Sequence, residues 1–513
     1  MIILDPVATA GDTSFARAST GTYFDRAGVL QTAAANAFRV TYNPGDLTAA
    51  PYALLEIAAS NLVPYSRQLE NVYWLKYQCT VTTDAAQGLD GTAYMDVLTA
   101  TAAGSCVVYR PSTESGERVL SAVFRTGTCS TALLSVDGVG SAQFSLVTGL
   151  VTTVGGGDCE LVKLGGGAYL FGFAYNAPNA ALINVGMNNA NPGETIGVSD
   201  IQLEAGKRMT SRIVTTGAPV TRAADVLGAA GTVLNSNVAE ADAPAWSAAT
   251  TYAAGQLVMS GHMIYQSKVG ANTNQAPPNI TYWQPISATN QRKMLDAYNN
   301  TQTQNADRIL LTLTPRAISQ GVYLGNLDAN SVTVAMVDPT DGLVYSLTES
   351  LIISDSASSF FNWAFKRIRR KTYFFTGQLP MYSSSVVTIG IEKTGSTAKC
   401  GMCCVGPLID IGLSQYGLGT EIKDYSSTTF AFDGTSATVV RGYAKRMSVD
   451  VVIENELIDS VQEQLAEFRQ KPVVFVGAAM FGSAIVYGKY SSFKNVIESF
   501  PWSKMALQIE GMV

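Results

Sequence analysis

Two short runs of apolar residues decide the fold class: CVVY at residues 106–109 and VLSAVF at residues 119–124. They lie in a longer region, residues 61–228, in which short apolar and polar runs alternate. Glycine clusters separate these runs at residues 155–157 and 165–167. Many short strands with frequent turn signals and no convincing helix are typical of a β-sandwich. We therefore expect a mainly β protein with a β-sandwich of the jelly-roll type over residues 61–228.

The region on the N-terminal side of this sandwich is rich in turns. Residues 25–28 read DRAG and residues 43–46 read NPGD, which are turn sequences between short strands. We expect residues 1–60 to form an extended β segment that packs with the sandwich.

The region on the C-terminal side divides by composition. Residues 229–242 are mostly Ala, Gly, Asn, Asp and Pro and predict a linker, and residues 243–288 predict a small three-stranded module dominated by aromatics. Residues 289–308 are polar and predict a connector for which a helix is one option. Residues 309–513 predict a C-terminal β-rich domain of one or two subdomains.

One helix is expected in that last region. Leu457, Ile458, Val461, Leu465 and Phe468 recur at helical spacing. Asn455 is a suitable capping residue before this run, and a proline at position 472 marks the latest point at which the helix has ended. We expect this helix to pack on a sheet.

Length and charge content indicate several domains. The chain has 513 residues, whereas single cores rarely grow beyond ~250 to 300 residues. Only 14% of residues are charged, compared with ~25% in typical domains. Surfaces so poor in charge suit β modules and faces that other subunits cover. We therefore expect a homo-oligomer.

The charge balance argues against nucleic acid as a partner. The net charge is −6, while nucleic-acid binding draws much of its affinity from clustered Lys and Arg. One basic run, residues 366–371, lies between aromatics within residues 360–375. Such a run is able to stack bases, but we favour a strand with inward aromatics whose charges contact a neighbouring subunit. Residues 360–375 are our candidate subunit contact.

No segment of the sequence predicts targeting or membrane insertion. The first residues, MIILDP, contain an acid before an apolar signal region forms. The longest apolar uncharged stretch, residues 472–488, is shorter than the ~20 residues that span a bilayer. We expect a protein made in a cytoplasm that does not insert into membranes.

Cysteine number and spacing predict free thiols. Seven cysteines are scattered along the chain, an odd number that fits no disulfide framework. Cys400 and Cys403 form a C-x-x-C, but no second pair lies at zinc-site spacing, and VGP at residues 405–407 follows in place of a helix. We expect buried strand thiols and no metal site.

Catalytic motifs are missing from the sequence. The single histidine, His262, stands beside Gly261 in an expected hairpin turn, and neither a G-x-S-x-G elbow nor a P-loop occurs. Two acids brought together by the fold suffice for a glycosidase, and with 40 acidic residues that alternative stays open. We expect no enzyme, no catalytic residues and no cofactor.

Short segments near both ends of the sandwich form a signature. They are SFARAS (14–19), YFD (23–25), GVL (28–30), Asn36, LLE (54–56), NLVPYS (61–66), IQLEAG (201–206) and TRAAD (221–225). These segments resemble the opening and the closing strands of bacteriophage tail proteins, in which a lectin-like or carbohydrate-binding-like sandwich follows the opening. The resemblance also favours a trimer, because tail tips follow three- or six-fold symmetry. RGYAKR at residues 441–446 and its surroundings resemble end regions of tail and baseplate proteins.

The small module resembles the chitin-type carbohydrate-binding module. The resemblance is carried by aromatics and turn glycines, and it implies sugar binding by Trp246, Tyr252, Tyr265, Tyr282 and Trp283. The family's adjacent aromatic pair is replaced here by SKV at residues 267–269, so a sugar-blind spacer is a second interpretation.

A module of about forty residues also needs aromatics for its own core. We expect at least two of Trp246, Tyr252, Tyr265 and Trp283 to pack together. Tyr282 is our first choice for an exposed sugar contact, because Trp283 beside it should point to the opposite face of a strand.

Together these resemblances predict a structural protein of a phage tail tip, baseplate or tail fibre, located in the virion and assembled in the host cytoplasm. Its expected partners are other tail or baseplate proteins, further copies of itself, and a host-surface glycan for attachment or virion decoration. One alternative is a polysaccharide-degrading tail enzyme. The other is a scaffold whose lectin-like modules make only protein contacts.

Overall fold

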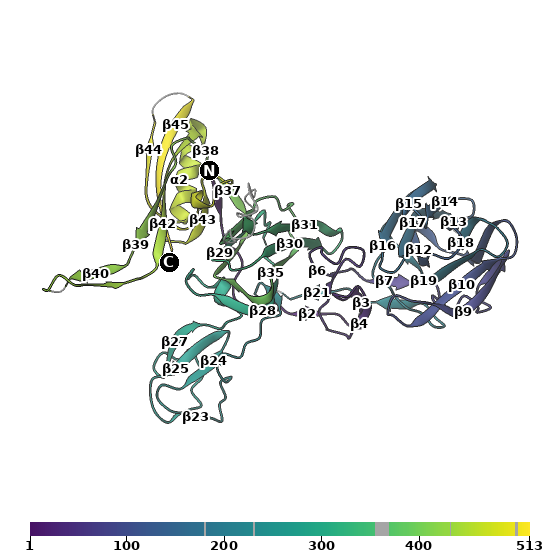
Figure 1. The fold of residues 1–513 in the computed structure, drawn as a ribbon, viewed down its shortest axis with the longest axis horizontal. Coiled ribbons are helices and arrows are strands. Elements are labelled where there is room, and N and C mark those ends of the chain that lie inside the picture. The colour runs from purple at the N-terminus through teal and green to yellow at the C-terminus, as the bar shows by residue number, and fades with distance from the viewer. Residues whose placement is uncertain are drawn as a thin grey trace. The chain divides into compact units, whose positions relative to one another are not determined.

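The computed structural model describes residues 1–178, 181–228, 231–315, 317–353, 369–430, 432–497 and 501–512. The described chain is mainly β and confirms the predicted fold class (Figure 1). It forms two compact units. Unit 1 consists of Met1–Ser14, Ala229–Asp338 and Leu343–Val513, and unit 2 of Phe15–Gly228 and Pro339–Gly342. The prediction grouped residues 1–60 together, whereas the contacts divide them after Ser14.

Unit 2 contains a sandwich of two six-stranded antiparallel sheets. The first sheet has the order β16 (Gly157–Lys163), β17 (Ala168–Pro178), β12 (Ser115–Arg125), β19 (Thr195–Ala205), β10 (Ala93–Ala100), β9 (Cys79–Gln87). The second sheet has the order β15 (Leu150–Gly155), β14 (Gly140–Ser145), β13 (Thr131–Val136), β18 (Ala181–Ala190), β11 (Gly104–Ser112), β8 (Leu75–Tyr77). From β10 to β13 and from β17 to β19, successive strands alternate between the sheets. This winding is that of a jelly roll, as the sequence predicted.

The core of the sandwich is built by alternate side chains of each strand, which point to one face of its sheet. In β12, Leu120 and Phe124 point into the space between the sheets and are fully buried. There Phe124 meets Phe144 and Phe171, whose ring centroids lie 4.7 Å apart. Val123, on the other side of β12, is also buried, in a second cluster with Leu30 and Met95. The first sheet is therefore covered on both faces, which explains why β12 reads as a nearly continuous apolar run.

Two short strand pairs join the segments before and after the sandwich. They are β2 (Phe15–Ala16) with β21 (Val226–Leu227), and β7 (Ala59–Asn61) with β20 (Val220–Arg222). A third pair, β3 (Gly21–Phe24) with β4 (Leu30–Ala33), lies within the segment before the sandwich.

Unit 1 begins with a five-stranded sheet. Its order is β22 (Val233–Ser236), β28 (Thr303–Leu313), β35 (Val386–Cys400), β30 (Ser331–Asp338), β31 (Gly342–Ser350). It shares a core with the three-stranded sheet β34 (Tyr373–Thr376), β29 (Gly321–Gly325), β36 (Met402–Gly406).

Two predicted connections prove to be structural elements. The expected linker supplies β22, because Val233 and Val238 are buried among the strands despite their polar surroundings. The expected connector, residues 289–308, contains a short 3-10 turn, η1 (Lys293–Leu295), and then the start of β28. Met294 is fully buried and fixes that turn to the core.

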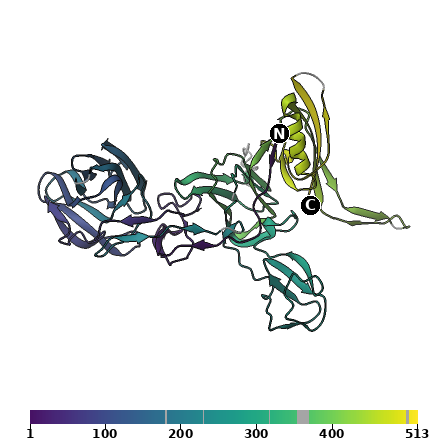
Figure 2. The same ribbon diagram turned by 180° about the vertical axis from the view of Figure 1, so that it is seen from behind.

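The C-terminal part of unit 1 is built on an eight-stranded sheet. Its main path is β37 (Leu408–Asp410), β1 (Ile2–Leu4), β43 (Val473–Val476), β44 (Ile485–Val496), β45 (Trp502–Gly511), β42 (Tyr443–Glu454), β38 (Leu413–Ser414). β39 (Gly419–Asp424) also pairs with β42. The helix α2 (Ile458–Glu467) lies on one face of this sheet, seen from behind in Figure 2.

The predicted helix is confirmed, but its expected start is wrong. α2 begins at Ile458 after a 3-10 turn, η2 (Asn455–Leu457), and no side chain caps it. The Asn455 carboxamide oxygen instead accepts a hydrogen bond from Ser503 Oγ at 2.5 Å. Ile458, Val461 and Leu465 face the sheet as expected. Leu457 is half exposed, because it lies in the 3-10 turn and off the helical face.

The small module has the predicted three strands. They are β24 (Leu257–Ser260), β25 (Met263–Ser267) and β27 (Trp283–Ala288), accompanied by the pair β23 (Thr251–Tyr252) and β26 (Asn272–Thr273). The β24–β25 hairpin turns at Gly261 and His262 with φ values of +57° and +65°. Such a turn matches the strand twist and explains the glycine.

A two-stranded hairpin of unit 1, here called the arm, forms a separate sheet and pairs with no other strand in the part of the chain that the structure describes. It consists of β40 (Ser427–Phe430) and β41 (Ser436–Val439), and every residue of both strands is exposed. Of the predicted contact at residues 360–375, residues 360–368 lie outside the described residues. Within the remainder, Phe374 of β34 is buried. In the described part of the chain, no helix has the length and apolar character needed to cross a membrane.

Candidate functional site

The aromatics of the small module divide into core and partly exposed residues. Tyr252, Tyr265 and Trp283 are 3%, 9% and 0% exposed and form the module's core with Val258. The rings of Tyr252 and Trp283 meet edge to face at 5.3 Å, and Trp283 Nε1 donates a hydrogen bond to the Gln275 carbonyl at 2.7 Å. The predicted packing of at least two aromatics is confirmed. A ring buried in this way offers no free face to a sugar, so three of the five predicted sugar contacts are structural.

Trp246 and Tyr282 are the two predicted sugar contacts that keep some exposure. Both are half-buried and pack against the core of the module. Tyr282 and Trp283 differ in burial as the strand alternation predicted. Sugar binding by this module therefore remains a prediction that rests on Trp246 and Tyr282.

His262 has the predicted position in a turn, but its ring is held by two carboxylates. Nε2 lies 3.0 Å from Asp12 Oδ2, and Nδ1 lies 2.9 Å from Glu240 Oε1. Burial raises the pKa of the Glu240 carboxyl, but hydrogen bonds from Thr289 and His262 outweigh it, so the pKa ends below its ordinary value. Glu240 precedes the module and Thr289 follows it. Through Glu240, His262 links the module's hairpin to the segments that precede and follow the module. This role of His262 is structural.

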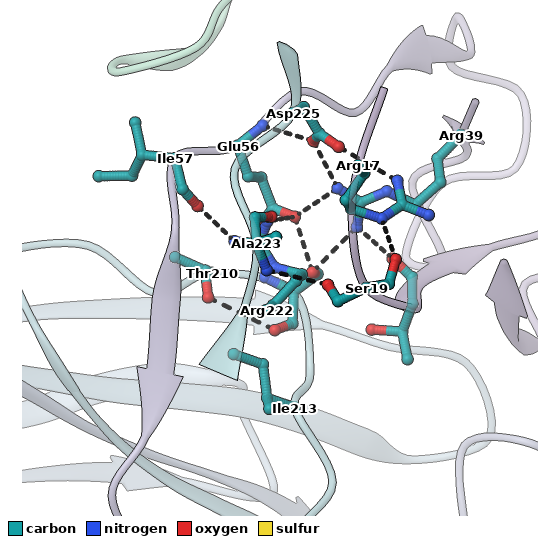
Figure 3. A network of polar contacts seen from close by, with 12 residues as sticks. Arg17, Ser19, Arg39, Glu56, Ile57, Thr210, Ile213, Arg222, Ala223 and Asp225 are labelled. Atoms are coloured by element: carbon teal, nitrogen blue, oxygen red, sulfur yellow. Dashed lines mark hydrogen bonds and ion pairs between the residues drawn. The ribbon is translucent and has the colours of Figure 1, made fainter. Parts of the chain in front are cut away.

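Residues from the phage-tail resemblance meet in a buried charge network (Figure 3). Asp225 lies 3.1 Å from Arg17 and 2.7 Å from Arg39, and all three side chains are fully buried. Glu56 lies 2.9 Å from Arg39 and 3.6 Å from Arg222. Burial raises the pKa of the Glu56 carboxyl, but the positive charges of Arg222 and Arg39 outweigh this effect. The pKa of Glu56 therefore lies below its ordinary value. The network fastens residues 15–60 to the segment after the sandwich.

That segment also covers the outer face of the first sheet. Arg212 Nη1 donates to Ser121 Oγ at 2.9 Å, and the Ile213 amide donates to Gln202 Oε1 at 2.8 Å. Asn61 Nδ2 donates to the Ile201 carbonyl at 3.1 Å. The chain itself therefore occupies the centre of this face, while a pocket of about 340 Å³ remains at its β16–β17 edge, lined by the charged residues Asp158, Glu160 and Lys207 among others.

The outer face of the second sheet, here called the open face, is where the sandwich presents side chains outward. Because Val108, Leu134 and Val185 point into the core, their neighbours along each strand point outward. One row across the strands pairs Tyr109 with Asn184, and Asn184 with Ser135. The polar and aromatic side chains of the open face are Tyr77, Ser105, Tyr109, Ser135, Gln143, Asn184 and Asn188.

Hydrogen bonds order the amides of the open face. Ser105 Oγ donates to Asn188 Oδ1 at 2.7 Å, and Asn188 Nδ2 donates to Gln143 Oε1 at 3.1 Å. At Gly186 the neighbouring strand approaches so closely that a Cβ would lie 2.3 Å from the Cys106 carbonyl oxygen. Only glycine fits there, and it keeps the centre of the face flat beside Tyr77, which is 52% exposed.

The chemistry of the open face suits a neutral polar ligand. The outward positions of β8, β11, β13, β14 and β18 carry no charged side chain. Carboxamides both donate and accept hydrogen bonds, as sugar hydroxyls do, and tyrosine combines an apolar ring with a polar end. These residues were not predicted as a binding site from the sequence. Their alternation was readable, but only the tertiary structure tells which sheet stays uncovered.

Among the described residues, no group of three or more His, Cys, Asp or Glu side chains is placed to hold a metal ion. Cys400, Cys403 and Cys404 are buried on β35 and β36, as predicted for strand thiols. Burial raises the pKa of Cys400 to about 12 and that of Cys403 well above its ordinary value.

Comparison with known proteins gives no family. No family model matches the sequence. No curated protein matches it either.

Similar solved structures include three sugar-related proteins. The N-terminal CBM22-1-CBM22-2 tandem domain of Paenibacillus barcinonensis Xyn10C is 11% identical (TM-score 0.20; 67% of this chain, 97% of that one). The GH78 family rhamnosidase of Bacillus sp. GL1 is 9% identical (TM-score 0.19; 83% and 36%). The tandem CBM51 modules of Sp3GH98, a family 98 glycoside hydrolase from Streptococcus pneumoniae SP3-BS71, are 9% identical (TM-score 0.16; 75% and 99%). TM-scores this low carry no weight for fold or function, so the mainly β, jelly-roll assignment rests on this chain's own strand order.

Proposed function

We propose that this chain is a carbohydrate-binding structural protein of a bacteriophage tail, and that it binds a host-surface glycan through the open face. The observation that carries the proposal is the contrast between the two outer faces of the jelly roll. One is largely covered by the chain itself and keeps a pocket lined by charged residues, and the other presents ordered amides and tyrosines, with Asn184 donating to the carboxylate of Asp137 at 2.8 Å.

The lack of charge favours a glycan over other ligands. Phosphate-rich ligands need Lys or Arg to neutralise them, and the outward positions of β8, β11, β13, β14 and β18 supply none. A protein partner is favoured by a large apolar patch. On the open face, the apolar residues Val107 and Leu133 are each only 6% exposed, while Leu75 (42%) and Leu150 (65%) are exposed on the edge strands β8 and β15. On the strands between these edges, what remains accessible is mainly amide, hydroxyl and tyrosine ring.

The tail assignment is supported by the sequence resemblance of residues 14–66 and 201–225. We propose a virion location, assembly in the host cytoplasm, other tail or baseplate proteins as partners, and binding without catalysis. The competing functions are a polysaccharide-degrading tail enzyme and a scaffold whose sandwich makes only protein contacts.

The test of the glycan proposal is a glycan array followed by calorimetry on the full chain and two variants. Tyr77→Ala removes an exposed ring of the open face, and Tyr416→Ala is the matched control, an exposed tyrosine of unit 1. Loss of one stacked ring should weaken binding about tenfold in the first variant and leave the second unchanged. An array without any bound glycan would favour the scaffold. Release of new reducing ends from host polysaccharide would favour the enzyme.

We also propose that the chain assembles as a homo-oligomer, with a trimer favoured, and that the arm contacts a second copy. Phe430 and Phe432 together expose roughly 300 to 450 Å², the size of patch that marks interaction sites. Residues 427–440 contain a single charge, Asp433, so identical arms meet without strong repulsion. Replacing residues 427–439 by a Gly-Ser turn should give a monomer in light scattering. An oligomer that survives this deletion would exclude the arm.

A further inference from the structure

Unit 1 contains a cavity of about 250 Å³ that the proposed function does not use. Four tyrosines line it, each from a different strand: Tyr323 (β29), Tyr373 (β34), Tyr443 (β42) and Tyr487 (β44). Asn299 and Lys445 also line it. The volume is a little below the about 300 to 1,000 Å³ of pockets for drug-sized ligands. It therefore has room for a ligand of about one ring.

The walls of this cavity are held in place before any ligand binds. Tyr323 and Tyr487 are buried in a common cluster with Leu4 and Val474. The ring of Tyr373 lies directly on Gly482, where a Cβ would come within 2.0 Å of the ring. A pocket with walls fixed in this way loses little entropy on binding.

Lys445 gives the cavity a positive charge. Its side chain is half-buried, and Nζ donates a hydrogen bond to the Gly482 carbonyl at 3.0 Å. Nζ also lies 5.8 Å from the centre of the Tyr373 ring. No carboxylate of the described residues forms an ion pair with Lys445, whereas Lys371, Lys423 and Lys471 each have one.

Burial lowers the pKa of Lys445, which shows that its charge is poorly solvated. An anion in the cavity would give the Lys445 ammonium the ion pair that no carboxylate of the described residues supplies. The carboxylate of Asp296 acts electrostatically on Tyr487, another residue of the cavity, but it is held by hydrogen bonds from the Tyr298 amide and Thr301 Oγ1.

One polar atom of the cavity residues lacks a hydrogen-bond partner. The Asn299 side-chain oxygen is buried and accepts no hydrogen bond among the described residues. Buried acceptors of this kind are rare, because an unmade hydrogen bond is costly. Because Asn299 lines the cavity, rotation of its carboxamide would bring this oxygen to a hydroxyl group of a ligand.

We propose that this cavity binds a sugar acid, a single sugar ring that carries one carboxylate. The carboxylate would pair with Lys445, a ring hydroxyl would donate to Asn299, and the ring would lie against Tyr373 and Tyr443, the two tyrosines of the cavity that keep exposed surface. Tyrosine surfaces favour the apolar face of a sugar ring, and the uncompensated lysine selects the acid over the neutral sugar. The proposal does not rest on the open face, which belongs to unit 2.

Calorimetry and saturation-transfer NMR on the full chain test this proposal with glucuronate, galacturonate, glucose, acetate and inorganic phosphate. We expect a uronate to bind at least ten times more tightly than glucose or acetate. Lys445→Met should weaken uronate binding at least tenfold. Lys504→Met is the matched control, because it removes one exposed lysine of β45 that does not line the cavity, and it should bind as the unmodified protein does.

A second variant tests the site without changing Lys445, so that a folding defect of Lys445→Met does not decide the outcome. Asn299→Asp places a negative charge beside the ligand and should weaken binding of the uronate but not that of glucose. Equal binding of acetate, phosphate and uronates would reduce the site to a simple anion site and overturn the sugar part. Absence of uronate binding at millimolar concentration, or full binding by Lys445→Met, would overturn the proposal. Tyr77→Ala should leave uronate binding unchanged, so failure of the open-face proposal is separately visible.

Discussion

Asp225 holds together the charge network of unit 2, and its neutralisation gives the sharpest test of the fold. In Asp225→Asn, Arg17 and Arg39 keep their buried positions but lose the carboxylate at 3.1 and 2.7 Å. Removing one partner of a buried ion pair typically costs about 3 to 5 kcal/mol, because the other charge stays desolvated. Glu56 compensates only in part, because it already contacts Arg39 and Arg222. We therefore expect a loss of about 3 kcal/mol in the region around residues 15–60.

Hydrogen exchange read by mass spectrometry measures this loss in the full chain. Opening of peptides from residues 15–60 should become roughly two orders of magnitude faster in Asp225→Asn. Glu117→Gln is the matched control, since Glu117 pairs with Lys207 at 2.8 Å on the exposed surface. Surface pairs contribute about 0 to 1 kcal/mol, so the control should change exchange less than about fivefold. An increase below tenfold in Asp225→Asn would refute the assignment of the network as the fastening of this region.

Three further predictions concern buried groups. Burial raises the pKa of Asp96 to about 6, even though the amides of Leu69 and Asp84 donate to it. The protonated form is therefore favoured in the folded state, so stability should fall by up to about 3 kcal/mol as pH rises from about 4 to about 6. Urea titrations should find this slope absent in Asp96→Asn; a slope that persists would contradict the assignment. Because burial raises the pKa of Cys79 to about 11 and of Cys400 to about 12, iodoacetamide should label the half-buried Cys159 first in the folded protein and all seven cysteines in denaturant. Peptide mapping that finds Cys400 labelled as fast as Cys159, or three or fewer reactive cysteines after denaturation, would contradict this. Trp283→Ala should cost about 3 to 5 kcal/mol and unfold the small module, whereas Tyr282→Ala should leave its proteolytic resistance nearly unchanged; equal effects would contradict the division into core and surface.

The sequence predicted those parts of the fold that depend on local patterns. Short apolar runs such as residues 106–109 and 119–124, which alternate with polar runs, identified the sandwich. Helical spacing identified α2. The module's three strands followed from its turns and aromatics. Each of these signals arises within a few residues of chain, where side-chain periodicity reflects one buried face.

Features that depend on distant contacts were missed. Asn455 has the right type for a cap, but Ser503 of β45 binds its side chain instead. Val233 stands in the Gly- and Asn-rich sequence GTVLNS (231–236), and only its partner Leu313 of β28, eighty residues away, makes it part of a sheet. His262 was read as a plain surface turn because Asp12 and Glu240 are brought to it by the fold. The open face was missed for the same reason.

The position of β1 has a consequence for the order of events during synthesis. Ile3 and Leu4 are fully buried, and β1 pairs on one side with β37 and on the other with β43. Both partners lie more than four hundred residues after β1 along the chain. At about 5 to 20 residues per second, the ribosome needs roughly half a minute to a minute and a half to pass from β1 to β43. Throughout that interval β1 waits unpaired while the residues of unit 2 are made, and the eight-stranded sheet closes only after β43 has been synthesised.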